Sequence, residues 1–237
     1  MKTEGHHARL LVVSDIHGHL EGLDMLLDMA EYRPKEDRLI LLGDFLDAGP
    51  GCEHSLLAAK RLAEGGATAL LGNRETAVLR AAASGSGGAG ELRAQDVRDG
   101  WRRKELSVIS NPDAIDWLQS LPGYLELDGY LFVHAGIRPH VPLKRQTLSD
   151  LTEIREDFWQ APDLGYPHTV IFGHTPTFKL GAAPGELWLG PGRIGIDTGA
   201  KYGYRLTLLD VHHRLTYSCT TSSGGRYGQC RIRKIHG

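Results

Sequence analysis

Five short polar segments carry the residue types that bind divalent metal ions. They are Asp15-Ile16-His17-Gly18, Gly43-Asp44-Phe45-Leu46-Asp47, Gly72-Asn73-Arg74-Glu75, His134-Ala135-Gly136 and Gly173-His174-Thr175. Carboxylate oxygen, imidazole nitrogen and amide oxygen, without thiolate, suit Mn²⁺, Fe²⁺ or Zn²⁺. One ion could take Asp15, His17 and Asp44, and a second Asp44, Asn73, His134 and His174. Two ions bridged by a shared carboxylate acidify the water between them, which can then attack phosphorus as hydroxide.

Each polar segment directly follows a short apolar run, and such runs bounded by turn residues predict buried strands. In the first half of the chain, strands are expected at 9–14, 38–42 and 68–71, and helices at 20–31 and 53–64. Another helix is expected after the third strand and ends at about residue 83. This alternation indicates an α/β core with parallel strands. Ligands collect at the carboxyl ends of such strands, where glycines allow sharp turns and a close approach of the backbone.

The second half of the chain changes character and is rich in strands. Runs at 130–133, 169–172, 193–196, 204–209 and 214–219 predict a second sheet packed on the first, with one helix over 148–159. Between the halves, a glycine loop at 84–90 and a helical pattern at 91–121 predict an insertion or cap. The tail from 220 to 237 carries four basic residues and no acid, which predicts a solvated end or a contact with an acidic partner.

Composition narrows the class of protein. The chain has 237 residues, 27 Lys and Arg against 29 Asp and Glu, and a formal charge of −2, which argues against general binding to nucleic acid or a membrane surface. No apolar run is long enough to cross a bilayer, and the N-terminus has no apolar signal core. The three cysteines Cys52, Cys219 and Cys230 are scattered, which favours reduced thiols. We therefore expect one cytoplasmic domain over 1–237.

In their order, the polar segments resemble the motifs of the PPP family of serine/threonine protein phosphatases, bacterial branch, within the calcineurin-like metallophosphoesterase superfamily. The family patterns are GDxHG, GDxxDRG, GNHE, HGG or HAG, and a late histidine. This chain has SDIHG at 14–18, GDFLDAG at 43–49, GNRE at 72–75, HAGIRP at 134–139, GHTP at 173–176 and then IDTGA at 196–200. The resemblance covers residues 9–211. It implies an αββα four-layer sandwich with a helical insertion at about 84–121, and hydrolysis of phosphate esters at two divalent ions, Mn²⁺ first, with Fe or Zn as alternatives.

The resemblance carries over six metal-binding positions, which are Asp15, His17, Asp44, Asn73, His134 and His174. The chain departs from the family at two others. The arginine that holds the substrate phosphate in the family is Ala48 here, and the histidine that protonates the leaving group is Arg74. An arginine keeps its proton but can bind phosphate oxygens through a planar fork of donors.

These departures lead to a hypothesis about the catalytic residues. Arg74 takes over phosphate binding lost at Ala48 and is held by an ion pair with Asp47, whose family counterpart orients the missing histidine. Arg155 in EIRED resembles an arginine that faces the phosphate in bacterial relatives; the alternative is a solvated helix arginine paired with acidic neighbours. Arg138 in HAGIRP is a weaker candidate for the same role.

Three functions fit the motifs. The first is a phosphatase acting on phosphoserine or phosphothreonine, with phosphotyrosine and small aryl phosphates as further substrates. The second is a dinucleoside polyphosphate hydrolase, because the phosphate that leaves an anhydride hardly needs a general acid. The third is a catalytically weak module that binds phosphorylated partners. We expect phosphorylated protein or small phosphate esters as partners, and neither nucleic acid nor membrane.

Overall fold

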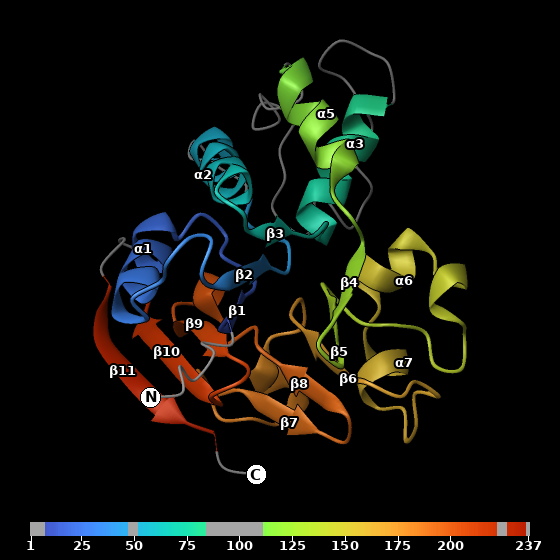
Figure 1. The fold of residues 1–237 in the computed structure, drawn as a ribbon. Coiled ribbons are helices and arrows are strands. Elements are labelled where there is room, and N and C mark those ends of the chain that lie inside the picture. Colours follow the sequence, from blue (N-terminus) through green and yellow to red (C-terminus); the bar gives the residue numbers. More distant parts are fainter. Residues whose placement is uncertain (1–7, 47–51, 84–110, 222–226, 236–237) are drawn as a thin grey trace, which may run out of the picture.

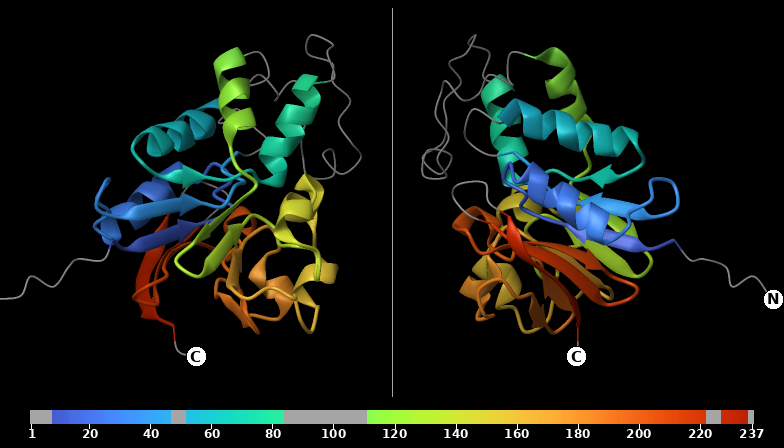
Figure 2. Two further views of the ribbon diagram at one scale, coloured as in Figure 1. Left: turned by 45° about the vertical axis from the view of Figure 1, so that its right-hand side comes forward. Right: turned by 90° about the vertical axis from the view of Figure 1, so that its left-hand side faces the viewer.

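Two β-sheets pack face to face, and helices cover their outer faces (Figures 1 and 2). The computed structural model describes residues 8–46, 52–83, 111–221 and 227–235. Alternate residues of β1 explain the layering, since Leu10 and Val12 pack between the sheets while Leu11 and Val13 pack under the helices. Strands with two buried faces read as continuous apolar runs, as these do.

The first sheet has the order β11-β10-β9-β1-β2-β3, and only its β1-β2-β3 part is parallel. Its strands are β1 (Leu10–Val13), β2 (Arg38–Leu41), β3 (Thr68–Ala69), β9 (Arg205–Asp210), β10 (Leu215–Thr220) and β11 (Gly228–Lys234). The helices on its outer face are α1 (Leu20–Met29), α2 (Cys52–Glu64), α3 (Asn73–Ala83) and α5 (Pro112–Ser120).

The second sheet has the order β4-β5-β6-β8-β7, with β5, β6 and β8 parallel. Its strands are β4 (Tyr124–Leu127), β5 (Tyr130–Val133), β6 (Thr169–Phe172), β7 (Trp188–Gly190) and β8 (Arg193–Gly195). Helices α6 (Leu148–Glu153) and α7 (Glu156–Trp159) cover it, and three 3₁₀ turns join it: η3 (Leu143–Arg145), η4 (Thr177–Leu180) and η5 (Ala200–Tyr202).

The predicted α/β fold with two sheets and flanking helices is confirmed, with three local corrections. The helix expected over 148–159 is two helices, because Ile154 is extended (ψ 147°) and Arg155 has ψ −111°. Strands β4 and β7 were not predicted. The basic tail is not simply a solvated end, since residues 228–234 form β11 and pair with β10.

The insertion predicted at 84–121 can be followed only in part. Residues 84–110 lie outside the described residues, while 112–120 form helix α5, as the pattern predicted. This helix begins at Asn111, whose side chain accepts a hydrogen bond from the Ala114 N–H at 3.3 Å. Within the described part of the chain, no helix is long and apolar enough to cross a membrane.

Candidate metal centre

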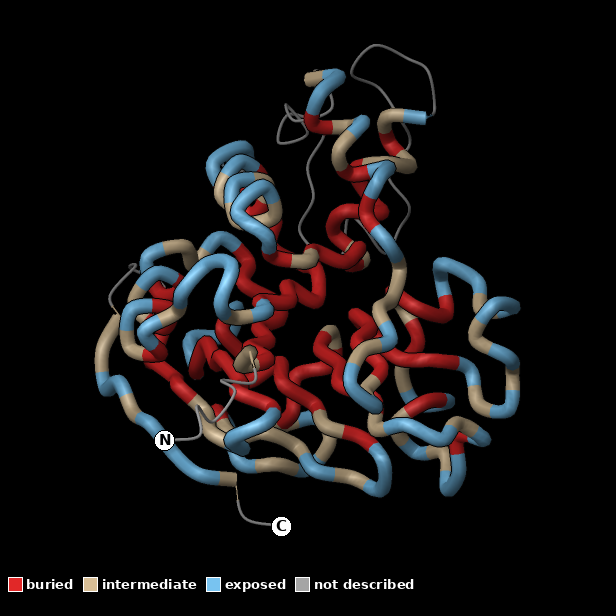
Figure 3. Tube along the Cα trace, viewed as in Figure 1, coloured by how far each residue is buried: buried red, intermediate tan, exposed pale blue. Residues whose placement is uncertain are grey.

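The buried stretches of the chain continue past the ends of the strands into the loops that carry polar residues (Figure 3). Asp15 and His17 follow β1, Asp44 follows β2, and His134 and His174 follow β5 and β6. Two backbone hydrogen bonds hold these loops together: Asp15 N–H donates to the Gly43 carbonyl at 3.2 Å, and Gly173 N–H donates to the His134 carbonyl at 2.7 Å. Each bond therefore joins two loops of the same sheet.

Asp15, His17 and Asp44 form the first group of donor atoms. The His17 Nε2 atom lies 3.7 Å from Asp15 Oδ1 and 3.7 Å from Asp44 Oδ2. The two sheets are joined at this point, because the His174 N–H donates to Asp15 Oδ2 at 2.9 Å. The Ser14 hydroxyl also bonds to Asp15 Oδ2.

Asp44, Asn73, His134 and His174 form the second group. Asn73 Oδ1 lies 3.0 Å from His134 Nε2 and 2.8 Å from His174 Nδ1. His134 Nε2 in turn lies 3.4 Å from Asp44 Oδ1. Asp44 therefore takes part in both groups, as a bridging carboxylate would.

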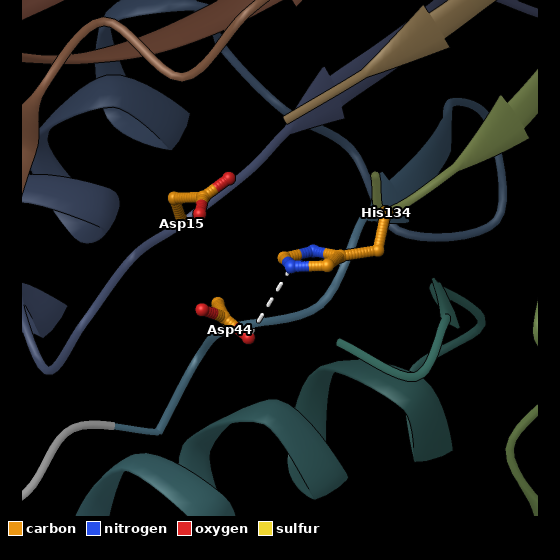
Figure 4. A group of neighbouring side chains, drawn as sticks. All are labelled: Asp15, Asp44 and His134. Carbon is orange, nitrogen blue, oxygen red and sulfur yellow. Dashed lines mark ion pairs between the residues drawn. The ribbon is translucent and has the colours of Figure 1, made fainter. Parts of the chain in front are cut away.

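The donor set fits a divalent cation. Single ligand atoms of Asp15, Asp44 and His134 lie within 4.8 Å of one another, and all three residues are buried (Figure 4). His134 Nδ1 lies 2.9 Å from the Leu42 carbonyl, an acceptor that fixes the proton on Nδ1 and leaves Nε2 to bind metal. The divalent ions of this kind of site thus have suitable ligands here.

The pKa values in the site follow from burial. Burial, with the neighbouring Asp44, raises the pKa of Asp15 to about 6, although His134 opposes this. Burial lowers the pKa of His17 to about 3 and that of His174 well below its usual value. Burial also acts to raise the pKa of Asp44, but His134, His17 and Arg74 outweigh it and the pKa is lowered. Neutral imidazoles are the metal-binding form, and a cation would offset the cost of burying two carboxylates.

The backbone is strained where it delivers these side chains. Asp15, His17, Asp44 and His174 have φ values of 52°, 44°, 50° and 63°, in the left-handed region that residues with a Cβ avoid. Such strain persists only where the surrounding structure over-determines it, and it clusters at functional sites. The glycines predicted to allow the sharp turns at the strand ends therefore account for only part of these turns. Gly72 allows its backbone to lie close to Asp44, because a Cβ there would collide with Asp44.

Glu75 lies beside the predicted metal ligands, and the sequence alone predicted no role for it. Its Oε2 accepts from the N–H groups of Asp44 (2.8 Å) and Gly72 (2.9 Å), and its Oε1 accepts from Leu46 (3.2 Å). Burial and Asp44 raise its pKa to about 7. The available signal was its place three residues after Gly72 at the start of α3, where an acidic side chain reaches back to the N-cap.

Asp197 was also missed. Burial and the charge of Asp15 raise its pKa well above the usual value, while a hydrogen bond from the Gly199 N–H (3.0 Å) opposes this. Its carbonyl accepts from the Thr177 N–H at 2.9 Å. Asp197 therefore links the loop after β8 to the loop that carries His174.

The predicted phosphate-binding arginines differ in their surroundings. Arg74 is 1% exposed; its N–H donates to Asp44 Oδ1 at 2.9 Å, and its Nε lies 3.9 Å from Asp44 Oδ2. Arg155 donates to the Thr175 hydroxyl at 3.4 Å, beside His174. Arg138 is instead paired with Asp150 (2.8 Å).

Asp47, the predicted partner of Arg74, lies outside the described residues, as does Ala48. The ligand roles of the six metal positions also stay predictions, although the structure brings all six side chains together.

Residues 8–205 match the family model described as calcineurin-like phosphoesterase. The chain belongs to this family. The predicted calcineurin-like metallophosphoesterase superfamily is thereby confirmed. Among curated relatives, a symmetrical bis(5'-nucleosyl)-tetraphosphatase of Aromatoleum aromaticum is 29% identical over 130 residues, 55% of this chain and 45% of the relative. Serine/threonine-protein phosphatase 1 of Salmonella typhimurium is 29% identical over 209 residues, 84% of this chain and 90% of the phosphatase.

Solved structures of this family share the fold. A crystal structure provisionally described as a diadenosine tetraphosphatase superimposes with a TM-score of 0.70 at 22% identity, covering 92% of this chain and 95% of that one. The chain spans about half the length of the curated tetraphosphatases that it matches, 45% in the case quoted above.

Proposed function

We propose that this calcineurin-like phosphoesterase hydrolyses dinucleoside polyphosphates. The carrying observation is Arg74, which occupies the position of the family's proton donor and lies buried beside Asp44. The proposal is supported by the relatives named symmetrical bis(5'-nucleosyl)-tetraphosphatase. It reverses the order expected from the sequence, in which a protein phosphatase came first.

In this proposal, the two groups of donor atoms hold two divalent ions, Mn²⁺ first, with Fe or Zn as alternatives. Asp15, His17 and Asp44 hold one ion. Asp44, Asn73, His134 and His174 hold the other. When bound, the ions supply an acidified water as the nucleophile and offset the charge of the phosphate chain. Asp44 fixes the spacing of the two groups because each of its oxygens faces a different histidine.

The leaving group decides which substrates suit Arg74. A guanidinium group keeps its proton, so it stabilises negative charge without transferring a proton. The nucleoside diphosphate that leaves from an anhydride is stable as an anion, whereas an alkoxide from a serine or threonine ester needs a proton donor. Arg155, beside His174, adds a second positive charge for the phosphate oxygens.

A panel of three substrates tests the proposal. Manganese-loaded protein, with its metal content measured, is given diadenosine tetraphosphate, p-nitrophenyl phosphate and a phosphothreonine peptide. We expect kcat/KM for the tetraphosphate to exceed that for the phosphothreonine peptide by at least about tenfold, since general acid catalysis absent from this site is worth about 10²–10⁴-fold on poor leaving groups. Symmetrical cleavage gives ADP alone. A higher kcat/KM on the peptide contradicts the proposal.

A protein phosphatase is the second candidate function. It is favoured by the length of the match, because the Salmonella phosphatase aligns over 90% of its own length whereas the Aromatoleum tetraphosphatase aligns over 45%. The same panel separates the two, since this candidate requires turnover of the phosphothreonine peptide. Two bound ions without turnover of any substrate would point to the phospho-binding module.

A further inference from the structure

Three aromatic side chains lie together on the two turns that follow the candidate metal centre. Phe178 is on η4, which begins three residues after His174, and Tyr202 and Tyr204 lie on and after η5. The ring centroid of Phe178 lies 5.5 Å from that of Tyr202 and 5.3 Å from that of Tyr204, with steep interplanar angles of 86° and 65°. We call these three residues the aromatic platform.

The aromatic platform is exposed, although it contains large rings. Tyr202 is 51% exposed and Tyr204 is 39% exposed, and Phe178 is half-buried. Edge-to-face packing brings the edge of one ring to the face of another, and the exposed parts of Tyr202 and Tyr204 lie at the protein surface. Tyrosine offers a large, rigid contact area at a low cost in conformational entropy, which suits a binding surface.

Hydrogen bonds through Asp197 and Gly199 join the two turns that carry the platform. Thr177 N–H donates to the Asp197 carbonyl at 2.9 Å, and Gly199 N–H donates to the Asp197 side chain at 3.0 Å. The N–H groups of Tyr202 and Tyr204 both donate to the Gly199 carbonyl, at 2.9 and 3.1 Å. Gly199 has φ 86°, and a Cβ there would lie 2.9 Å from the Tyr204 ring. The platform is therefore held in place before any ligand binds.

Two lysines are neighbours of platform residues in the chain, Lys179 of Phe178 and Lys201 of Tyr202. Lys179 Nζ lies 5.6 Å from the centroid of the Tyr202 ring. Lys201 precedes Tyr202, and its charge reaches His17, where it adds to the effect of burial and of Arg74 in lowering the pKa. The charge of Lys179 likewise acts on Asp197 against the effect of burial. Positive charge therefore accompanies the platform and acts on His17 and Asp197.

We propose that Phe178, Tyr202 and Tyr204 form a stacking site for a nucleobase of the substrate, and that Lys179 and Lys201 attract the phosphate chain attached to it. This inference rests on the proposed function and names the part of the substrate that is recognised. Every base has a π-face, and stacking on aromatic side chains is tolerant of base identity. The site therefore accepts adenine and guanine nucleotides with similar affinity.

Binding measurements test the platform without turnover. The probes are ADP, GDP and inorganic pyrophosphate, titrated calorimetrically into manganese-loaded protein. In the double variant Tyr202→Leu/Tyr204→Leu, we expect ADP and GDP each to bind at least about tenfold more weakly, because a base–aromatic stack is worth about 5–150-fold in affinity. Pyrophosphate, which has no base, should change by less than about twofold.

Two further variants keep the result interpretable. Tyr202→Phe/Tyr204→Phe retains the rings and should restore ADP binding, while Ile232→Ala on β11, where Ile232 is 55% exposed, is a surface control. Equal ADP affinity in the wild type and the Leu double variant overturns the inference, as does an equal loss for ADP and pyrophosphate. The proposed function is decided separately, because it depends on turnover of diadenosine tetraphosphate by the wild type.

Discussion

Asp44 and Tyr202 follow strands whose carboxyl ends meet at the same place, yet Asp44 is 2% exposed and Tyr202 is 51% exposed. We call the six predicted metal-binding residues the floor of the site. Floor side chains are fixed by backbone groups of other loops, as Asp44 is by the Arg74 N–H and Asp15 by the His174 N–H. The aromatic platform is fixed mainly through its own turns and ring contacts.

This difference separates two tasks. A change in the floor alters the ions and the nucleophile, which every substrate needs. A change at the platform alters only the recognition of the part of the substrate that lies beyond its phosphates. Floor variants should therefore lower kcat on all substrates alike, and platform variants should affect nucleotides selectively.

The largest effect is expected from Asp44→Asn. Loss of the shared carboxylate should lower kcat at least about 10³-fold on both diadenosine tetraphosphate and p-nitrophenyl phosphate, because the two ions supply several kcal/mol of stabilisation. Steady-state kinetics with measured metal content checks this. Asp28→Asn, at an exposed position of α1, is the matched control. Full activity of Asp44→Asn would remove the two-metal mechanism.

A smaller loss is expected from Glu75→Gln. Glu75 is a positioning residue, since its carboxylate accepts three backbone N–H groups that orient Asp44 and Asn73. An amide group has only one acceptor oxygen, so at least one N–H loses its partner. We expect Mn²⁺ affinity to fall by about 10–100-fold, as for other residues that support metal ligands. Unchanged metal affinity with lower thermal stability would reduce Glu75 to a purely structural role.

Arg74→His restores the residue type that the family uses as a proton donor. The ratio of alkyl to aryl phosphate turnover should rise at least about tenfold, because a general acid helps poor leaving groups most. Turnover of diadenosine tetraphosphate should not gain in the same way. An unchanged ratio, in protein with normal metal content and thermal unfolding, would refute the proposed role of Arg74.

The smallest effect is expected from Arg155→Lys, at the boundary between floor and platform. Lysine keeps the charge but not the planar fork of donors, so KM should rise about three- to tenfold. The rise should be equal for diadenosine tetraphosphate and p-nitrophenyl phosphate, since both present phosphate oxygens. A rise confined to the nucleotide would place Arg155 with the platform instead.

The sequence predicted the fold class and the meeting of the polar loops because both follow from local patterns. Buried parallel strands require apolar runs, and their carboxyl ends must share an edge, so the order of Asp15, Asp44, His134 and His174 was informative. Strand β11 was missed because none of its residues is buried and Ile232 is itself 55% exposed, so no apolar run marks the strand. The break at Arg155 was missed because no glycine or proline marks it.

Glu75, Asp197 and the aromatic platform depend on contacts between distant loops. Asp197 acquires its role by bonding to Thr177, and Phe178 meets Tyr202 only through the folded arrangement of η4 and η5. Apart from the place of Glu75 three residues after Gly72, no spacing along the chain indicates these contacts. The left-handed φ values of Asp15 and Asp44 likewise result from the loops around them.

The proposed function requires that this floor cleaves phosphate bonds without a general acid. The most direct measurement is kcat/KM of the manganese-loaded wild type across a series of phosphate esters ordered by the pKa of the leaving group, from nitrophenyl to alkyl. We expect a steep fall in kcat/KM as the leaving-group pKa rises. A flat dependence would show that a proton is delivered to the leaving group and would contradict the claim.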